Sequence, residues 1–393
     1  MAVKRSFTVA DVRGRRVLVR VDFNVPQTDS GAVADDRRIL EALPTLRHLR
    51  DHGARTILMS HLGRPRGRPD PRFSLKPVVD RLAGYLGQPV TLAGDSVGPA
   101  ARAAVDALRD GGFVMLENLR FEPGEEANDP AFAQGLADLG DLFVEEAFGT
   151  VHRAHASTVG VPRLRPAYAG FLVAKEIRAL SRLLEGVDRP YVALLGGAKV
   201  ADKLPLLRSF LGRVDALLIG GALCFPFLAA QGADLGATSV ETGVTDDAID
   251  FLETARARGT PVLLPEDFLV EVPGRSSAEA SSARHVPAGA IARDLGPATR
   301  DRFHATLADS RTVFWNGPLG LAEDPRFAPG TREVLAGLAA VPGFHVCAGG
   351  DSARIAEDLG VAEAFQYIST GGGAALEFVQ GAELPGLAVI PDA

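Results

Sequence analysis

Short apolar runs alternate along the chain with longer segments in which apolar residues recur every three or four positions. The short runs are rich in Val, Leu, Ile and Phe and end at Gly, Pro or Asp, which is typical of β-strands. The predicted strands are 17–25, 55–60, 112–118 and 141–148, followed by 191–195, 215–221, 260–265, 311–316, 344–350 and 364–370. Segments with helical spacing include 75–87, 98–111, 245–259 and 331–343. This alternation predicts an α/β protein with parallel sheets covered by helices on both faces.

The number of predicted strands indicates more than one domain. Strands such as 191–195 (YVALL) are apolar throughout, which fits burial on both faces. A single sheet of so many strands is improbable, so we predict two doubly wound, Rossmann-like domains. The predicted boundary is the helical stretch 170–186, which leaves domains at 1–169 and 187–379. The Ser/Ala-rich stretch RSSAEASSA (275–283) is predicted to be a surface loop.

Composition and charge indicate a globular protein and disfavour general binding to nucleic acid or to membranes. Hydrophobic residues make up 46% and charged residues 23%, which is ordinary for a globular protein. The net charge of −7 gives no general attraction to nucleic acid or to an anionic membrane, so any anion site must be local. Two distant cysteines, Cys224 and Cys347, exclude a disulfide framework. The chain starts without an apolar signal region, and its apolar runs are broken by Gly and Pro, so we predict a cytoplasmic protein.

Glycines gather where strands of the second half end. Pairs or triplets occur at 196–197, 220–221, 349–350 and 371–373. One such turn could simply need a left-handed residue, but four at one sheet edge favour backbone N–H groups that approach a phosphate. The chain has neither a P-loop motif nor a G-x-G-x-x-G fingerprint, which disfavours a P-loop NTPase and a dehydrogenase.

Several polar residues accompany these glycines. Lys199 and Lys203 are four residues apart, and two like charges on one helix face are unfavourable unless an anion faces them. Asp351 follows CAGG directly and could be a helix N-cap or a contact for Mg²⁺. Glu323 could accept from ribose hydroxyls or could be a solvated loop carboxylate, and Asn316 precedes a further glycine turn.

The first half places cationic side chains after its predicted strands. Asp22 and Asn24 alternate in VRVDFNVP, so both point to one side. The basic residues at the strand ends are Arg38, His61, Arg64, Arg120, His152, Arg153 and His155, of which we read His155 as structural. Any one arginine could be a solvated surface charge, but the set suits a small, highly anionic substrate. The basic residues are not interleaved with aromatic ones, which disfavours nucleic-acid binding.

These motifs together carry a family resemblance that covers nearly the whole chain. VRVDFNVP, SHLGRP, ENLRF, HRAHASTVG, GGAKVADK, DLGPAT, VFWNGPLG, GGDSA and STGGGAALE, in this order, resemble the phosphoglycerate kinase family. The resemblance implies two α/β lobes joined by a helix, with the tail 380–393 returning to the first lobe. It also implies reversible phosphoryl transfer between 1,3-bisphosphoglycerate and Mg-ADP, giving 3-phosphoglycerate and Mg-ATP, by a monomer whose lobes close before transfer.

The resemblance also implies roles for individual residues. The triose would be bound by Asp22, Asn24, Arg38, His61, Arg64, Arg120 and Arg153. The nucleotide would be bound by Lys199, Lys203, Asn316, Glu323, Gly350, Asp351, Ser352, Gly371, Gly372 and Gly373, with Asp351 also contacting Mg²⁺. The catalytic set would be Arg38, Lys199, Gly349 and Gly372, in which Lys199 follows the migrating phosphoryl group.

The chain departs from the family pattern at three places. Glu145-Glu146 stands where the family has Asn-Asp, ALCFPF (222–227) brings Pro226 near the expected adenine pocket, and Ala322 replaces an aromatic residue. These departures bear on lobe closure and nucleotide preference. They leave open a paralogue that acts on another anionic carboxylic acid, or a catalytically silent nucleotide-binding scaffold.

Overall fold

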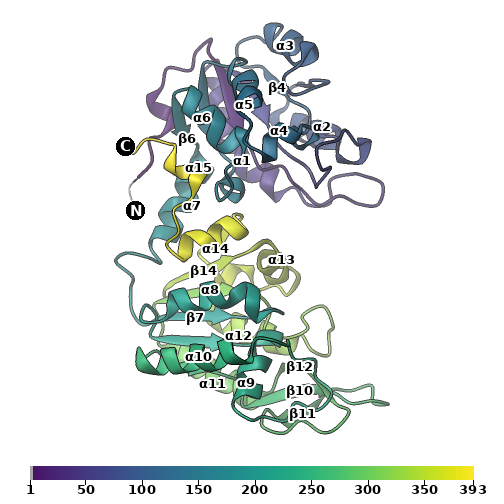
Figure 1. The fold of residues 1–393 in the computed structure, drawn as a ribbon, viewed down its shortest axis with the longest axis vertical. Coiled ribbons are helices and arrows are strands. Elements are labelled where there is room, and N and C mark those ends of the chain that lie inside the picture. The colour runs from purple at the N-terminus through teal and green to yellow at the C-terminus, as the bar shows by residue number, and fades with distance from the viewer. Residues whose placement is uncertain (1–2) are drawn as a thin grey trace. The chain divides into compact units, whose positions relative to one another are not determined.

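The computed structural model describes residues 3–393 and divides into two compact units (Figure 1). The first unit runs to Leu180 and also takes in Glu383–Ala393, and the second is Ser181–Ala382. The division falls within the segment 170–186 predicted to link the domains, where helix α7 (Phe171–Ser181) ends. Each unit contains one six-stranded sheet.

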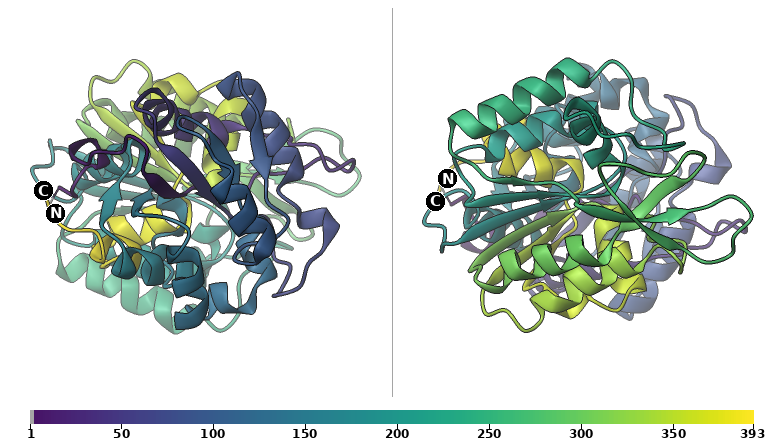
Figure 2. Two further views of the ribbon diagram at one scale, coloured as in Figure 1. Left: turned by 90° about the horizontal axis from the view of Figure 1, so that it is seen from above. Right: turned by 90° about the horizontal axis from the view of Figure 1, so that it is seen from below.

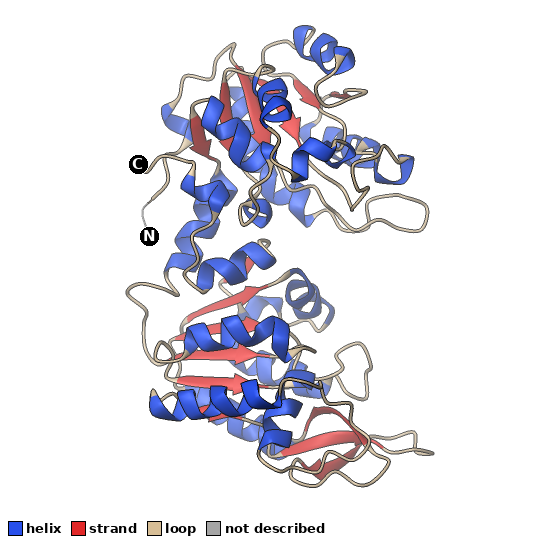
Figure 3. Ribbon diagram, viewed as in Figure 1, coloured by secondary structure: helices blue, strands red, loops and turns tan. Residues whose placement is uncertain are grey.

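The sheet of the first unit has the strand order β3-β4-β2-β1-β5-β6, and every pairing in it is parallel. Its strands are β1 (Arg16–Arg20), β2 (Arg55–Met59), β3 (Val90–Leu92), β4 (Phe113–Met115), β5 (Leu142–Glu145) and β6 (Ala167–Ala169). The helices of this unit are α1 (Arg37–Asp51), α2 (Lys76–Leu86), α3 (Pro99–Asp106), α4 (Pro123–Glu126), α5 (Pro130–Ala137), α6 (Val161–Leu164), most of α7, and α15 (Pro385–Ala388). Figure 3 shows these helices around the strands.

Continuous apolar runs form these strands because both sheet faces are buried. Val17 and Val19 of β1 belong to the core on one face, and Leu18 between them belongs to the core on the other. The chain end closes against the same unit, since Gly386 N donates to Val151 O at 2.8 Å and Lys4 Nζ pairs with Asp392 at 2.8 Å.

The second unit has a parallel sheet of order β15-β14-β13-β7-β8-β9, with helices on both faces (Figure 2). Its strands are β7 (Tyr191–Leu195), β8 (Ala216–Ile219), β9 (Val262–Leu263), β13 (Thr312–Asn316), β14 (Phe344–Ala348) and β15 (Tyr367–Ser369). Its helices are α8 (Val200–Phe210), α9 (Phe225–Ala230), α10 (Thr245–Ala257), α11 (Pro297–Ala308), α12 (Pro329–Leu338), α13 (Gly350–Asp358) and α14 (Gly373–Val379). Trp315 is fully buried in β13 and stacks on Phe365 with ring centroids 5.3 Å apart.

A small antiparallel sheet of order β11-β10-β12 adds to the second unit and corrects one prediction. Its strands are β10 (Asp267–Glu271), β11 (Glu279–Ser282) and β12 (Ile291–Leu295). The stretch 275–283 was predicted to be a loop, but half of it is β11. Its small polar side chains show no apolar alternation, so the pairing with β10 alone makes it a strand.

Candidate active site

In the first unit, the predicted triose residues follow strands that run parallel, so they gather at one sheet edge. Asp22 and Asn24 follow β1, His61 and Arg64 follow β2, and Arg120 follows β4. Arg153 follows β5 and is exposed, as is Arg64. The cluster is strongly cationic because Asp22 is the one acidic member of the predicted set.

Three of these polar residues are held by hydrogen bonds with good geometry. Arg38 Nη1 lies 2.8 Å from Asp22 Oδ2 in a partly buried ion pair. Asn24 Oδ1 accepts from Gly63 N at 2.8 Å, which ties the chain after β1 to the chain after β2. Gly63 has φ +63° and its added Cβ would lie 2.4 Å from Phe73, so only glycine fits there.

His61 is buried and neutral. Its Nδ1 lies 3.1 Å from Arg20 Nη2, and a guanidinium can only donate, so Nδ1 accepts and the ring proton is on Nε2. Burial, aided by the charges of Arg20 and Arg120, lowers the pKa of His61 well below 6.5. His61 therefore offers an Nε2–H donor and no positive charge near pH 7.

Arg20 supports this site and was missed by the sequence analysis. It is 1% exposed and its Nε donates to Ser157 Oγ at 2.8 Å. Ser157 Oγ in turn donates to Glu125 at 2.6 Å, and burial raises the pKa of that carboxyl. The sequence does indicate Arg20, because it lies two residues before Asp22 and four before Asn24, and such side chains point to the same side of an extended segment.

Arg120 and His155 are both buried, and burial lowers the pKa of each side chain. Arg120 is buried, donates from Nη1 to Gly63 O at 2.9 Å and pairs through Nε with Glu126 at 3.1 Å. Desolvation lowers the pKa of Arg120, and the negative charge of Glu126 opposes the shift. His155 is also buried, and burial together with nearby arginines lowers its pKa to about 4. The ring of His155 is therefore neutral near pH 7, and its structural role stays a prediction.

Glu145 and Glu146 are fully buried at the end of β5. Burial raises the pKa of Glu145 to about 8, and it raises the pKa of Glu146 well above 4.5. Glu145 Oε1 accepts from Ala147 N at 2.9 Å, while Oε2 has no hydrogen-bond partner. Glu146 accepts from Leu172 N with both oxygens at 3.2 Å, so this carboxyl holds the first turn of α7. Burial therefore favours the protonated form of both carboxyls.

In the second unit, glycine turns bring three strand ends into backbone contact. Gly197 N donates to Pro318 O at 2.9 Å, and Gly221 N donates to Leu319 O at 2.7 Å. An added Cβ on Gly196 would lie 2.0 Å from Pro318 O, and one on Gly221 would lie 2.6 Å from the same atom. The close approach of the chains requires glycine at both positions, and Gly221 also has the left-handed backbone, φ +62°, that the sequence left open as the alternative to a phosphate contact.

Lys203 and Asn316 are brought together at this edge. Lys203 Nζ donates to Asn316 Oδ1, and Asn316 Nδ2 donates to Ala348 O at 2.6 Å. Burial lowers the pKa of Lys203 to about 8, although Asp351 opposes the shift. Ser352 Oγ accepts from Gly317 N at 2.8 Å and so joins β13 to α13. Gly349 has φ +102°, and an added Cβ there would lie 2.6 Å from Asn316 Nδ2.

The start of α8 differs from the expectation for a helix that follows a glycine turn. We expected its N–H groups to be available to an anion. Instead Glu241 Oε2 accepts from Val200 N at 2.5 Å, so a side chain of this protein caps the helix. Glu241 lies 41 residues beyond Val200, and nothing local in the sequence indicates this cap. Lys199 is the N-cap residue and its side chain is exposed.

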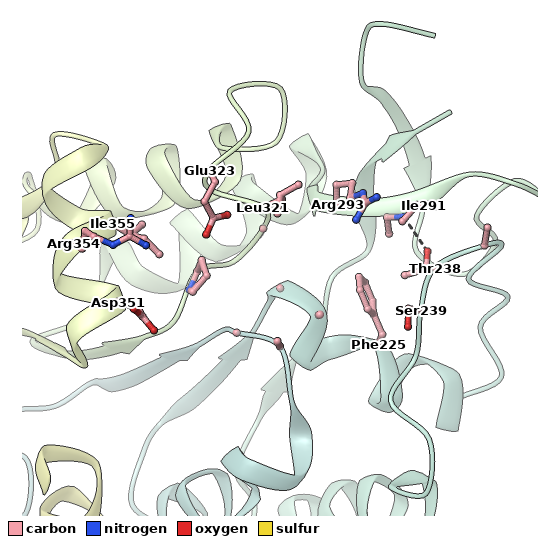
Figure 4. Close-up of a pocket in the computed structure, with 18 residues that line it drawn as sticks. Phe225, Thr238, Ser239, Ile291, Arg293, Leu321, Glu323, Asp351, Arg354 and Ile355 are labelled. Atoms are coloured by element: carbon pink, nitrogen blue, oxygen red, sulfur yellow. Dashed lines mark hydrogen bonds between the residues drawn. The ribbon is translucent and has the colours of Figure 1, made fainter. Parts of the chain in front are cut away.

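A pocket of about 730 Å³ opens beside these turns (Figure 4). Of the predicted nucleotide residues, only Glu323 and Asp351 are among the residues that line it. The others do not line it, namely Lys199, Lys203, Asn316, Gly350, Ser352 and the triplet 371–373. Figure 4 shows Asp351 and Arg354 at one end and Phe225, Thr238, Ser239 and Arg293 at the other, with Glu323 and Leu321 between them. Phe225 lines the pocket, and Pro226 is buried next to it in the first turn of α9.

The donor set of the pocket fits a magnesium ion carried by a ligand. No group of three or more His, Cys, Asp or Glu side chains that could hold a metal occurs within residues 3–393. Mg²⁺ is typically held by one or two carboxylates together with substrate phosphates and water. Asp351 is exposed at the start of α13 and lines the pocket, so it meets that requirement.

Cys224 and Cys347 are both buried, and neither is part of a disulfide. Within the described part of the chain, no helix has the length and apolarity needed to cross a bilayer.

Comparison with known proteins gives one consistent result. The family model described as phosphoglycerate kinase matches residues 7–382. The chain is 50% identical to a phosphoglycerate kinase of Thermus thermophilus, covering 98% of this chain and 99% of that one. It is 47% identical to one of Chlorobaculum tepidum, covering 99% and 100%. The structure of a phosphoglycerate kinase from Coxiella burnetii matches with a TM-score of 0.88 at 35% identity over 98% of both chains.

Proposed function

The chain belongs to the phosphoglycerate kinase family, a family of glycolysis and gluconeogenesis that uses Mg-ADP and Mg-ATP, and we propose how its own residues perform the reaction. The reaction is reversible transfer of a phosphoryl group from 1,3-bisphosphoglycerate to Mg-ADP, which gives 3-phosphoglycerate and Mg-ATP. The observation that carries the proposal is that the chain has both a cationic sheet edge, in the first unit, and a glycine-lined pocket with Asp351 and Glu323, in the second.

The triose binds at the cationic edge of the first unit. Arg38, already oriented by Asp22, and the buried Arg120 bind the anionic groups of the substrate, since a guanidinium grips carboxylate and phosphate bidentately. His61 donates from Nε2, and its neutral state places a hydrogen bond there without adding charge. Asn24, Arg64 and Arg153 complete the set.

The nucleotide binds in the pocket of the second unit. Glu323 accepts from ribose hydroxyls and Asp351 is the protein contact for Mg²⁺, both from the pocket lining. Lys203, which donates to Asn316 at the same sheet edge, binds a nucleotide phosphate. The other nucleotide contacts are Asn316, Gly350, Ser352 and the triplet Gly371–Gly373. A bound Mg²⁺ would neutralise phosphate charge as it develops.

Catalysis requires that the two substrates are aligned and that the charge of the transferred phosphoryl group is neutralised, and it requires no general base. The acceptor carboxylate is ionised at pH 7, so no proton has to be removed from it, and phosphoryl transfer mainly demands aligned, charge-compensated reactants. Arg38 and Lys199 neutralise the transferred group, and backbone N–H groups at Gly349 and Gly372 add donors. The exposure of Lys199 leaves its side chain free to follow the group. Closure of the lobes, the monomeric state and a cytoplasmic location stay predictions.

Retention of the complete arginine set favours the triose over another carboxylic acid as substrate. A buried arginine is costly unless anions compensate its charge, and Arg120 is buried with Glu126 as its ion-pair partner, so a highly anionic substrate adds the charge that this cationic edge lacks. Retention of both lysines and Asp351 favours an enzyme over a silent scaffold.

The test is a hydroxylamine-trapped assay with Mg-ATP and 3-phosphoglycerate. We expect hydroxamate formation that depends on the triose and falls at least 100-fold in Lys199→Ala, because the variant loses a charge that acts on the transferred group. Lys76→Ala, the same exchange on exposed helix α2 of the first unit, is the matched control and should retain activity. Absence of product with Mg-ATP binding still present in calorimetry would refute the proposal, and equal activity of the two variants would refute the role of Lys199.

A further inference from the structure

The end of the pocket farthest from Asp351 contains a charged side chain that the reaction does not use. Arg293 lies on β12 and lines the pocket with Thr238, Ser239 and Phe225 (Figure 4). It comes from the antiparallel sheet, which the sequence analysis did not predict. Of the residues that the structure describes, Arg293 is the one charged side chain that lines this end of the pocket, so we ask which group of a ligand it could bind.

Arg293 is held in one orientation with part of its guanidinium unused. Its Nε and Nη2 both donate to Glu271 Oε2, at 3.0 and 2.8 Å. Arg326 also pairs with Glu271, at 3.2 Å, and the two arginines lower the pKa of this carboxyl. Within the described residues, no hydrogen bond involves Nη1 of Arg293, so its two N–H groups are available to a ligand.

The order of groups along the pocket places the base of a nucleotide at this end. Asp351 and the start of α13 suit the phosphates, and Glu323 in the middle suits the ribose. The remaining end offers the ring of Phe225, a flat apolar face against which a base can pack. This step rests on the proposed function, since it assumes that a nucleotide occupies the pocket.

The polar groups at this end are matched to acceptors on the base. Arg293 Nη1 is a donor, and the hydroxyl of Thr238, which already accepts from Ala292 N at 2.9 Å, has its proton left to donate. The lining carboxylates are Glu323 and Asp351, and neither is at this end (Figure 4). Guanine presents two acceptors, O6 and N7, on one edge, whereas adenine presents an amino donor beside N7.

We infer that Arg293 is a specificity-determining residue that reads the O6/N7 edge of a guanine base, so that guanine nucleotides are substrates at least as good as adenine nucleotides. One N–H of Nη1 and the second N–H of Nη2 lie side by side at the end of the guanidinium and can form paired bonds to O6 and N7, whereas they face the N6 amino group of adenine donor to donor. The tether to Glu271 lowers the entropy lost when these bonds form, because the side chain is oriented before the nucleotide arrives.

The experiment compares kcat/KM for Mg-GTP and Mg-ATP with saturating 3-phosphoglycerate in the full chain. For the unchanged protein we expect a GTP-to-ATP ratio of one or more. Arg293→Met should lower this ratio at least fivefold, through loss of GTP efficiency. Arg354→Met is the matched control, because Arg354 lines the same pocket at the Asp351 end and should affect both nucleotides alike.

A ratio below one in the unchanged protein, or a change of less than fivefold in Arg293→Met, would overturn the inference. Calorimetric binding of GDP and ADP without the triose separates this outcome from failure of the proposed function. If no transfer occurs with either nucleotide but Arg293→Met still weakens GDP selectively, the inference on the pocket stands and the proposed reaction fails. Circular dichroism melts of the variants establish that they are folded.

Discussion

The stability of Glu145→Gln relative to the unchanged protein should increase as pH rises. In the folded protein Glu145 is fully buried beside Glu146, and burial raises its pKa from 4.5 to about 8. In the unfolded chain the same group ionises near 4.5. The folded state therefore binds more protons than the unfolded state between these two values, and its stability falls as pH rises through that window.

The size of the effect follows from the two pKa values. Each pKa unit corresponds to about 1.4 kcal/mol, so between pH 5 and pH 8 this one group lowers the free energy of unfolding by about 3 kcal/mol. Glu145→Gln does not ionise, and its amide oxygen still accepts from Ala147 N. The stability of the variant minus that of the unchanged protein should therefore rise by about 3 kcal/mol from pH 5 to pH 8.

Urea unfolding at pH 5, 6.5 and 8 measures this difference. Circular dichroism follows the whole chain, and the fluorescence of Trp315 follows the second unit, where Glu145→Gln should have no effect. Glu383→Gln, at an exposed position of the first unit, is the control for the exchange itself. A difference between Glu145→Gln and the unchanged protein that stays constant from pH 5 to pH 8 would refute the argument that this carboxyl is protonated in the folded state.

Two predictions concern the second unit. The nucleotide kcat/KM should fall as pH rises through about 8, because Lys203 has a pKa of about 8 and its neutral amine attracts phosphate less. Lys203→Arg keeps its charge and should move the fall to higher pH, and the same profile in both proteins would contradict this role. Gly349→Ala should lower the free energy of unfolding by about 1–3 kcal/mol, because the residue has φ +102° and its Cβ would meet Asn316 Nδ2. Gly360→Ala is the control, because Gly360 has φ +70° but no atom within 4 Å of an added Cβ. Unfolding of both variants is followed by Trp315 fluorescence. An equal loss of unfolding free energy in both would show that the clash with Asn316 contributes nothing.

Local patterns were sufficient for the two parallel sheets and for most candidate residues. Strands such as β7 and β13 are apolar throughout because both their faces are buried, and this burial is visible in a short stretch of sequence. Parallel strands place their carboxyl ends at one edge, so Asp22, His61 and Arg120 could be grouped without coordinates. Arg20 could have been added to them from its phase with Asp22.

Other features could not be predicted because their cause is distant in the chain. Strand β11 exists because β10 pairs with it, and its own polar side chains carry no strand signal. The cap on α8 is supplied by Glu241, 41 residues away from Val200. The glycines at 196 and 221 were read as phosphate contacts, whereas both are required by the close approach of Pro318 O.

The sequence by itself determined the α/β class, the parallel sheets and the sets of residues at their edges, since each depends on neighbours within a few positions. Only the tertiary structure decided the charge states of the buried groups and the place of Arg293 in the pocket. Burial makes His61 neutral and keeps Glu145 protonated, and burial depends on every element packed around a side chain. Arg293 reaches the pocket only because the antiparallel sheet brings β12 there and Glu271 on the neighbouring strand holds its guanidinium in place.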